Sequence, residues 1–490
     1  MTESSMRVLH VCSEIYPLLK TGGLADVAGA LPVAQGKSGC DARVLVPGFP
    51  ALRAGILDQQ LVAEVNPAFG AKAIRLFLGT LPGSSLAVYV IDAPDLYDRP
   101  GNPYADANNH AYPDNDRRFA LLGWIAARMA DGLDASWQPQ VVHAHDWHAG
   151  LAPAYLKAAQ QATGRRLAGS VQTIHNLAYQ GNFPGHVFGE LGLPAHFYSV
   201  DGLEFHGNCS FLKAGLFYAD KLTTVSPTYA REIQGSEQGC GFDGLLRARA
   251  GDLVGILNGV DDAVWNPATD RLIPHPYDTR SVAGKLKGKT ALQQEGGLAV
   301  QNDAPLFCVV SRLTDQKGLH LVLDALPRIL ERGGQIMVLG SGDAELEAGF
   351  QAAAAAHPQS VAVKIGYDEQ LSHRLIGGSD VILVPSRFEP CGLTQLYGLK
   401  YGTLPLVRRV GGLADTVVDC SLENLDESLA TGFVFDSFDA AGIGAAIRRA
   451  FALYRRKSDW KQVQKRAMLQ QFGWETAAAQ YLALYRQIAT

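Results

Sequence analysis

Short apolar segments alternate with helix-like segments along most of the chain, and this alternation restricts the fold more than any other feature of the sequence. Most of the apolar segments are followed by a glycine-bearing or charged loop and then by a helical pattern. Repeated strand–helix units of this kind predict an α/β protein with parallel, doubly wound sheets. The predicted strands are, in chain order, Arg7–Ser13, Ala42–Pro47, Ser85–Ala93, Gln140–His145, Gly169–His175, Lys221–Ser226, Leu253–Leu257, Leu306–Val310, Gln335–Leu339, Val361–Ile365, Val381–Val384 and Leu404–Val407.

The length of the chain predicts more than one domain. At 490 residues it exceeds what one hydrophobic core supports, and ~150 residues per domain gives two to three domains. The segment Thr269–Gly297 contains prolines, lysines and glycines and is predicted to be a surface connection, with a domain boundary just before it, near Leu257. Asp95–Asp116, polar and rich in tyrosine, is predicted to be a long loop. Trp474–Ile488 has the periodicity of an amphipathic helix, which could pack on either domain.

Charge, cysteine content and the N-terminal sequence predict a cytoplasmic protein. The net charge of −5 gives no support for bulk binding to nucleic acid or to an anionic membrane. The seven cysteines are scattered, without a CxxC or Cys/His ligand spacing, so we expect reduced thiols rather than disulfides or a zinc site. The N-terminal residues lack the basic and apolar regions of a secretory signal, and no run of ~18 apolar residues predicts a membrane span.

A charged, glycine-bearing turn, Pro385–Gly398, follows the apolar segment Val381–Val384. Ligands of open α/β sheets bind at the carboxyl ends of the strands, where such loops converge. Glu389 stands between an aromatic residue and a proline, an unusual place for a carboxylate that is only a solvated charge. The backbone amides of Gly392–Thr394 would open the next helix, a position that favours phosphate. The alternative is a polar loop with an incidental glutamate.

Two further loops combine cations with glycines or with a strand end. Lys20 precedes Gly22 and Gly23 at a predicted helix start, and an ammonium with backbone amides suits a phosphate, although the Walker A spacing is absent. Arg312 and Lys317 follow a predicted strand, and such a pair of cations suits a diphosphate. A plain turn and a solvated surface loop are the respective alternatives.

Three histidines and an aspartate cluster where another predicted strand ends. His143 and His145 alternate along the strand and therefore face the same way, with Asp146 and His148 following. A metal site is one interpretation, but no Glu or Cys ligand motif accompanies them, so we expect no metal and favour a polar wall of a site. His175 ends the next predicted strand, where it can contact a sugar hydroxyl or serve a structural role.

A five-residue sequence occurs twice, as Gly22–Asp26 and as Gly411–Asp415. No short period accompanies it, so it does not indicate a solenoid. Two similar domains, each with a diglycine loop at a helix start, would explain the repetition, and chance is the alternative.

Taken together, these segments resemble the bacterial glycogen synthases, which are relatives of the starch synthases. The resemblance covers nearly the whole chain, and several uncommon motifs occur in the order of that family. The motifs are Lys20–Val27, His143–Gly150, His175–Gly181, Ser226–Ala230, Leu257–Asp261, Ser311–Gly318 and Pro385–Gly398.

The resemblance implies a glycosyltransferase of the GT-B fold, with two doubly wound Rossmann-like domains facing across a cleft. It implies an N-terminal acceptor-side domain of residues 1–256 with a returning C-terminal helix, 474–490, and a nucleotide-sugar-binding domain of residues 257–473. The implied reaction transfers glucose from ADP-glucose to the 4-hydroxyl at a non-reducing end of an α-1,4-glucan, with retention of the anomeric configuration. Glycogen or another α-1,4-glucan is then the partner, and no metal or pyridoxal phosphate is expected.

The resemblance also implies roles for individual residues. Arg312 and Lys317 are expected to bind the donor diphosphate and Glu389 the glucosyl hydroxyls. The remaining donor-side residues are expected to be His175 and Asn258 on the glucose, Lys20 with Gly22 and Gly23 on the phosphates, Cys391, Gly392 and Leu393 through their amides, and Tyr367 and Thr394 on the adenine and phosphate side. Glu14, Asp26 and Asp146 are the candidates for the acceptor side.

Two departures from wider patterns bear on the mechanism. Many retaining GT-B enzymes have a second glutamate eight residues after the first, where this chain has Tyr397, so ribose recognition cannot be carried over. Retaining glycosidases use two carboxyl groups ~5 Å apart, one as nucleophile, and the sequence shows no such partner for Glu389. We therefore expect departure and attack on the same face of the sugar, with a covalent intermediate left open.

Two other functions are alternatives. A glucan phosphorylase of the same fold would need a lysine that forms a Schiff base with pyridoxal phosphate, and no motif marks one. A non-enzymatic glucan-binding protein is favoured only by the aromatic loop around residues 95–112.

Overall fold

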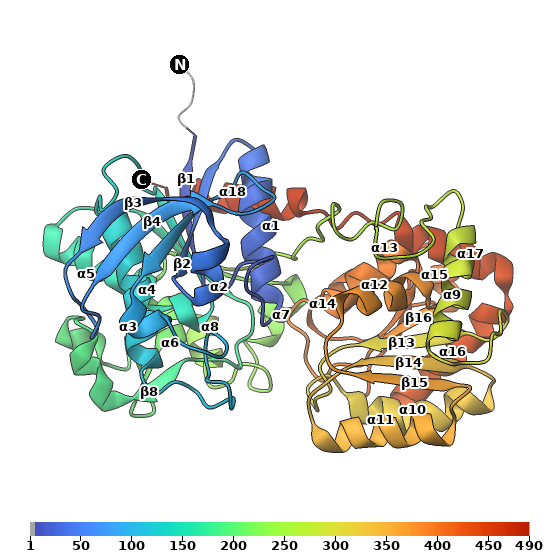
Figure 1. The fold of residues 1–490 in the computed structure, drawn as a ribbon. Helices are drawn as coiled ribbons and strands as arrows, with labels where there is room; N and C mark the ends of the chain where they lie inside the picture. Colours follow the sequence, from blue (N-terminus) through green and yellow to red (C-terminus); the bar gives the residue numbers. More distant parts are fainter. Residues whose placement is uncertain (1–4, 490) are drawn as a thin grey trace. The chain divides into compact units, whose positions relative to one another are not determined.

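The computed structural model describes residues 5–489, which divide into two compact units (Figure 1). Unit 1 contains the residues up to Gly259 and those from Trp474 onward, and unit 2 is Val260–Gly473. The division follows Gly259, three residues beyond the predicted end of the first domain at 256.

Unit 1 is built on a nine-stranded sheet in which β1 occupies the fifth place. β1 pairs in parallel with β2 on one side and with β6 on the other, in a register that sets Val8 beside both Ala42 and Val141. Every residue of β6 and β7 is buried, as expected of parallel strands covered on both faces. In sheet order the strands are β12 (Leu253–Gly255), β11 (Lys221–Thr224), β7 (Gly169–Ile174), β6 (Val141–His145), β1 (Arg7–Val11), β2 (Asp41–Pro47), β5 (Ala87–Asp92), β4 (Ile74–Thr80) and β3 (Leu57–Val65).

Helices cover this sheet, and one of them comes from the end of the chain. The last helix, α18, packs against α1, and its buried residues form one core cluster with Val8, Val27 and Leu31. The α-helices of unit 1 are α1 (Gly23–Lys37), α2 (Pro50–Gly55), α3 (Pro94–Tyr97), α4 (Asn115–Ala130), α5 (Leu151–Thr163), α6 (Phe211–Tyr218), α7 (Pro227–Glu232), α8 (Asp243–Ala248) and α18 (Trp474–Tyr485), with a small sheet of β8 (Asn182–Pro184), β10 (Asn208–Ser210) and β9 (Glu204–Phe205).

Unit 2 contains a six-stranded sheet in which every pairing is parallel. Its strands are, in sheet order, β15 (Val361–Ile365), β14 (Gln335–Gly340), β13 (Leu306–Val310), β16 (Val381–Val384), β17 (Leu404–Arg408) and β18 (Phe433–Phe435). Its helices are α9 (Ala283–Glu295), α10 (Leu319–Glu331), α11 (Ala344–Ala356), α12 (Glu369–Gly378), α13 (Thr394–Tyr401), α14 (Gly411–Thr416), α15 (Leu422–Asp426), α16 (Ala440–Arg455) and α17 (Lys457–Met468). Two Rossmann-like α/β units therefore make up the described chain, as the alternation of segments predicts.

The sequence did not predict two strands of unit 1, and one prediction for unit 2 is wrong. Beside the parallel strands of unit 1, β3 and β4 add an antiparallel edge next to β5. These strands are partly exposed, with Leu57 and Leu61 about half accessible, so they lack the continuous apolar run of a buried strand.

The segment Thr269–Gly297 is not a mere surface connection. It contains α9, and Ile273, Tyr277 and Leu292 belong to the core of unit 2. The lysine content of this segment is misleading because the Lys289 ammonium is buried and bonded to the carboxylate of Asp380 at 2.7 Å.

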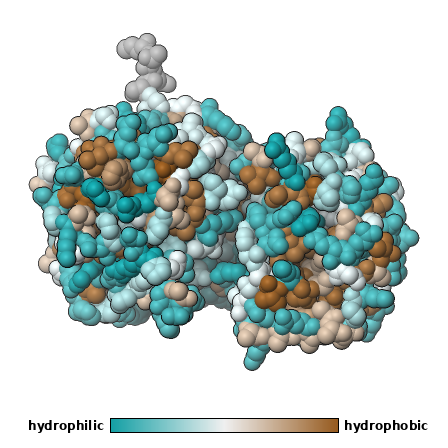
Figure 2. All heavy atoms as spheres, in the orientation of Figure 1, coloured by the Kyte–Doolittle hydropathy of each residue, from teal (hydrophilic) through white to brown (hydrophobic). Residues whose placement is uncertain are grey.

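The surface and the cysteines are those expected of a protein with buried hydrophobic cores. On the face shown in Figure 2, hydrophobic residues form separate patches among hydrophilic ones. All seven cysteines are free, and six of them are buried. None of the helices among residues 5–489 is both long enough and apolar enough to cross a membrane.

Candidate active site

The order of the strands in unit 2 identifies where a ligand would bind. From β13 the chain runs outward to β14 and β15, and it then returns to β16, beside β13, before it continues to β17 and β18. The carboxyl ends of β13 and β16 therefore form a topological switch point, the place where open α/β sheets bind ligands. The loop after β13 carries Arg312 and Lys317, and the loop after β16 carries Glu389.

The Glu389 carboxylate is the centre of this site. It is 6% exposed, and its Oε2 accepts hydrogen bonds from Lys317 Nζ at 2.6 Å and from the Ser386 hydroxyl at 2.8 Å. Bonds to an ionised group are stronger than neutral ones, so these two donors fix the orientation of the carboxylate. A pocket at this strand edge is lined by Val310, Ser311, Lys317, Leu319, Leu383, Val384, Pro385, Ser386, Glu389, Gly392, Leu393 and Thr394.

Glycines allow the loops of this site to pack backbone against backbone. Gly318, at a φ of +68°, faces the carbonyl of Pro385, and a Cβ there would lie 2.2 Å from that oxygen. Gly411, at a φ of +43°, faces the carbonyl of Glu389, and a Cβ there would lie 1.9 Å from it. The repeated diglycine sequence thus supports the Glu389 loop in unit 2, a role that its spacing alone did not indicate.

The other predicted residues of unit 2 surround this pair. The Arg312 side chain is exposed and makes no hydrogen bond or ion pair to a described residue, so it is free to bind an anion. Tyr367 is 75% exposed and its hydroxyl donates to Glu369. Thr394 is the first residue of α13 and lines the pocket.

The loop between Glu389 and α13 presents backbone amides. The amides of Gly392 and Leu393 make no hydrogen bond to a described residue, and both residues line the pocket. Cys391 is buried and stands beside them in the chain. Free amides next to a helix start can bind an oxygen or a phosphate.

In unit 1 the predicted glycine loop is held by a buried carboxylate. Glu14 is 2% exposed and accepts hydrogen bonds from the backbone amides of Thr21 at 2.5 Å and Gly22 at 3.3 Å. It also accepts from the hydroxyls of Thr21 and Tyr104. Glu14, a candidate for the acceptor side, therefore shapes the loop that carries Lys20.

Lys20 and Asp26, predicted for different roles, form an ion pair with each other. Lys20 Nζ lies 2.9 Å from the Asp26 carboxylate, with the two side chains 34% and 21% exposed. Gly23 begins α1, and a Cβ at Gly22 would meet no atom within 4 Å. The space beside Gly22 is therefore open.

Asp146 and His175 lie at the carboxyl ends of β6 and β7. The Asp146 carboxylate is buried and accepts the backbone amides of His175 at 2.7 Å and Asn176 at 3.3 Å. Burial raises the pKa of Asp146 to about 7, and it lowers the pKa of His175 to about 3, so the imidazole is neutral. Asn258, after β12, is buried at 7% exposure.

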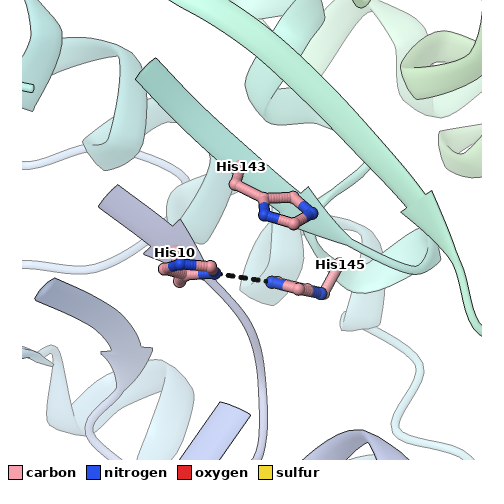
Figure 3. Close-up of side chains that lie close together, drawn as sticks. All are labelled: His10, His143 and His145. Atoms are coloured by element: carbon pink, nitrogen blue, oxygen red, sulfur yellow. Dashed lines mark hydrogen bonds between the residues drawn. The ribbon is translucent and has the colours of Figure 1, made fainter. Parts of the chain in front are cut away.

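Three buried imidazoles, those of His10, His143 and His145, lie together behind this edge (Figure 3). One nitrogen from each ring falls within a group whose atoms are no more than 4.8 Å apart, close enough to hold a metal ion. All six ring nitrogens, however, have a hydrogen-bond partner at 3.0 Å or less. A metal would have to break some of these bonds, so the geometry favours a hydrogen-bonded network, and the expectation of no metal stays a prediction.

Sequence reasoning missed several residues of these sites. Ser386 lies three residues before Glu389 in the motif Pro385–Gly398. Its hydroxyl, close in sequence to the carboxylate, is the feature that could have identified it. Tyr104 belongs to the aromatic loop and stacks on His148 with ring centroids 4.6 Å apart. His10 and Gln35 gave no signal, because they bond to His145 and Tyr485, which lie 135 and 450 positions away in the sequence.

Two protein-family models match this chain, one in each unit. The model of the starch synthase catalytic domain matches residues 7–248, and that of the glycosyl transferases group 1 matches residues 293–467. The chain is 64% identical to a glycogen synthase of Leptothrix cholodnii over 487 residues, which cover 99% of this chain and 100% of that one. It is 61% identical to a glycogen synthase of Francisella tularensis subsp. novicida over 484 residues, 99% of each chain.

A solved structure of a starch synthase catalytic domain is also similar to this chain. The catalytic domain of starch synthase IV from Arabidopsis thaliana, bound to ADP and acarbose, superposes with a TM-score of 0.89 at 30% sequence identity. The superposition covers 99% of each chain.

Proposed function

Because the chain belongs to the glycogen and starch synthase family, we propose that it transfers glucose from ADP-glucose to the non-reducing-end 4-hydroxyl of an α-1,4-glucan, elongating glycogen. Its two Rossmann-like domains have the GT-B fold of glycosyltransferases. The observation that carries the proposal is the buried Glu389 carboxylate bonded to Lys317 at the switch point of the unit 2 sheet. At that place the Glu389 carboxylate can accept hydrogen bonds from a sugar, and the Lys317 ammonium beside it can bind a diphosphate.

We propose that Arg312 and Lys317 bind the diphosphate of the donor. Charge accumulates on the leaving ADP as the glycosidic bond breaks, and cations held in place stabilise that charge in the transition state. Lys317 is 20% exposed and held by Glu389, whereas the Arg312 guanidinium is exposed and unpaired among the described residues. Lys317 is thus positioned before the donor arrives, and Arg312 can adapt to it.

Glu389 is proposed to accept hydrogen bonds from the glucosyl hydroxyls, with the amides of Cys391, Gly392 and Leu393 donating to the same sugar or its phosphate. Tyr367 and Thr394 are proposed for the adenine and phosphate side. The openness of the Gly392 and Leu393 amides and the exposure of Tyr367 support these roles.

In unit 1 we propose that His175 and Asn258 contact the glucose and that Lys20, with the amides of Gly22 and Gly23, contributes to phosphate binding. Lys20 would exchange its bond to Asp26 for one to phosphate, a partner with greater charge.

The three acidic candidates for the acceptor side have partners within unit 1. Glu14 and Asp146 accept backbone amides of site loops, and Asp26 pairs with Lys20. We infer that Glu14 and Asp146 act on the acceptor through the loops that they hold, and that Asp26 acts through Lys20.

Departure of ADP and attack by the acceptor on the same face of the sugar is the mechanism that we favour. Oε2 of Glu389 already accepts two hydrogen bonds, one from an ammonium, and such bonds reduce the nucleophilicity of a carboxylate. The departing phosphate can take the proton of the acceptor hydroxyl. Because departure and attack occur on the same face of the anomeric carbon, the configuration is retained. Neither a metal nor pyridoxal phosphate has a role in these steps.

The free thiols support a proposed cytoplasmic location, since disulfides are rare in that compartment.

The test is ADP release with ADP-glucose or UDP-glucose as donor and glycogen as acceptor, combined with incorporation of labelled glucose. We expect ADP release that requires glycogen and label that an exo-acting α-1,4-glucan hydrolase removes. Glycogen binding without ADP release would instead favour a glucan-binding protein. Turnover that depends on inorganic phosphate and a bound pyridoxal chromophore would favour a phosphorylase.

A further inference from the structure

A chain of side-chain hydrogen bonds connects the core of unit 1 to His175. Gln35 Oε1 lies 2.8 Å from His10 Nε2, and His10 Nδ1 lies 3.0 Å from His145 Nε2. His145 Nδ1 then lies 2.9 Å from His175 Nε2. Gln35, His10 and His145 are completely buried, and Figure 3 shows the bond between the two histidines of β1 and β6. This series of hydrogen bonds ends at the partly exposed imidazole of His175, which is predicted to contact the donor sugar.

The imidazoles in this chain are neutral. Burial lowers the pKa of His10 to about 4, that of His175 to about 3, and that of His145 well below its ordinary value. A neutral imidazole has one N–H and one lone pair, so each ring donates on one side and accepts on the other. Every bond of the chain must therefore point in the same direction.

The amide of Gln35 sets that direction. Its oxygen faces His10 Nε2, so His10 donates from Nε2 and accepts at Nδ1. His145 consequently donates from Nε2 and accepts at Nδ1, and His175 donates from Nε2. This leaves the lone pair of His175 on Nδ1, which makes no hydrogen bond to a described residue.

Tyr485 of α18 orients the Gln35 amide. Gln35 Nε2 donates to the Tyr485 hydroxyl at 3.1 Å, and that hydroxyl lies 2.6 Å from His143 Nδ1. A phenol has one proton, so Tyr485 accepts from Gln35 and donates to His143. His143 in turn donates from Nε2 to the Thr173 hydroxyl at 2.5 Å. Each hydrogen bond in this branch therefore agrees with the donor-to-acceptor direction of the bonds from His175 to Gln35.

We propose that Gln35, oriented by Tyr485, is a positioning residue that holds His175 in the Nε2–H tautomer through His10 and His145, so that Nδ1 accepts a hydrogen bond from a hydroxyl of the transferred glucose. The C-terminal helix thereby controls which atom of a site histidine carries its proton. The contact with glucose rests on the proposed function, whereas the tautomer does not.

The tautomer is measured by long-range ¹H–¹⁵N correlation spectra of the full protein with ¹⁵N-labelled histidine, with the His175 signal assigned by its loss in His175→Asn. We expect a protonated Nε2 and an unprotonated Nδ1. Gln35→Met removes the acceptor at nearly constant side-chain length, and Tyr485→Phe removes the hydroxyl that orients the amide. In both variants we expect His175 to become a mixture of tautomers.

Tyr481→Phe is the matched control. Tyr481 lies one turn earlier on α18 with its ring 5.3 Å from that of His143, and its hydroxyl is not a member of the chain. This variant should keep the wild-type tautomer and activity. An Nδ1–H tautomer in the wild type, or a tautomer that is unchanged in folded Gln35→Met and Tyr485→Phe, would overturn the proposal. A stoichiometric metal in the purified protein, bound by these rings, would overturn it as well.

Kinetics separate this proposal from the proposed function. With ADP-glucose and glycogen, Gln35→Met should lower kcat/KM roughly tenfold, the effect of one neutral hydrogen bond, and Tyr485→Phe should lower it in the same direction. If the tautomer shifts but His175→Asn retains full activity, the assigned contact with glucose fails and the positioning chain stands. If His175→Asn is impaired but the His175 tautomer is unchanged in Gln35→Met, only the positioning proposal fails.

Discussion

Gly411→Ala tests whether the diglycine loop holds the Glu389 carboxylate in place. Gly411 has a φ of +43°, and an alanine Cβ would lie 1.9 Å from the carbonyl oxygen of Glu389. Real Cβ contacts essentially never fall below 3.0 Å. The two backbone segments must therefore separate by about 1.1 Å (3.0 − 1.9), and Glu389 lies on one of them.

The cost can be estimated from its parts. A left-handed φ costs an alanine about 1–2 kcal/mol, and the steric displacement adds about 1–3 kcal/mol. Alanine recovers about 0.4–1 kcal/mol by restricting the unfolded chain, which leaves a net destabilisation of about 1–5 kcal/mol. Since a misplacement of about 1 Å at a catalytic group can cost on the order of 10²-fold in rate, we expect a comparable loss of kcat/KM.

Gly333→Ala is the matched control in the same unit. Gly333 has a φ of +77° and nothing within 4 Å of the ideal Cβ, so it isolates the backbone cost, about 0–2 kcal/mol, without a clash. Melting temperature and kcat/KM for ADP release are measured for both variants. Equal activity in the two variants would refute the view that Gly411 supports the Glu389 loop.

Three other changes probe neighbouring contacts. Lys317→Met should raise KM for ADP-glucose and lower kcat/KM by at least about 10²-fold, and unchanged donor kinetics would remove it from the diphosphate site. Ser386→Ala deletes one bond to Glu389 and should lower kcat/KM about tenfold, with an effect below twofold counting against a role in orienting the carboxylate. Asp146→Asn keeps an oxygen for the amides that Asp146 accepts but cannot ionise. Because burial raises the pKa of Asp146 to about 7, the folded protein holds a proton that the unfolded chain releases, and wild-type stability falls as pH rises from about 4 to 7. The variant should gain stability over the wild type across that range, by up to about 4 kcal/mol, and melting curves whose difference does not change between pH 5 and 8 would contradict this.

Much of the fold and of the unit 2 site can be predicted from the sequence because the signals are local. Buried parallel strands such as β13 and β16 are continuous apolar runs, and the loops that follow them carry Lys317 and Glu389 in compact motifs. The topology of parallel sheets then brings those strand ends to one edge. The ion pair between the two residues, 72 positions apart, follows from that edge.

The features that the sequence does not predict involve polar residues whose positions depend on contacts with distant parts of the chain. β3, at the edge of the sheet, and its neighbour β4 are missed because both keep exposed residues, and α9 is misjudged because Lys289 is buried against Asp380. The bond between Gln35 and Tyr485 spans 450 positions and has no motif, so only the packing of α18 on α1 reveals it.

The central claim is that Glu389, held by Lys317, binds the sugar whose bond is broken. The most direct test is steady-state ADP release by Glu389→Gln with ADP-glucose and glycogen, together with calorimetric titration of ADP. Glutamine keeps the size of the side chain but loses the charge that Lys317 and the transition state require. We predict that kcat falls at least 10²–10³-fold while ADP still binds, as expected for a contact made mainly in the transition state. Turnover within about threefold of the wild type would contradict the account.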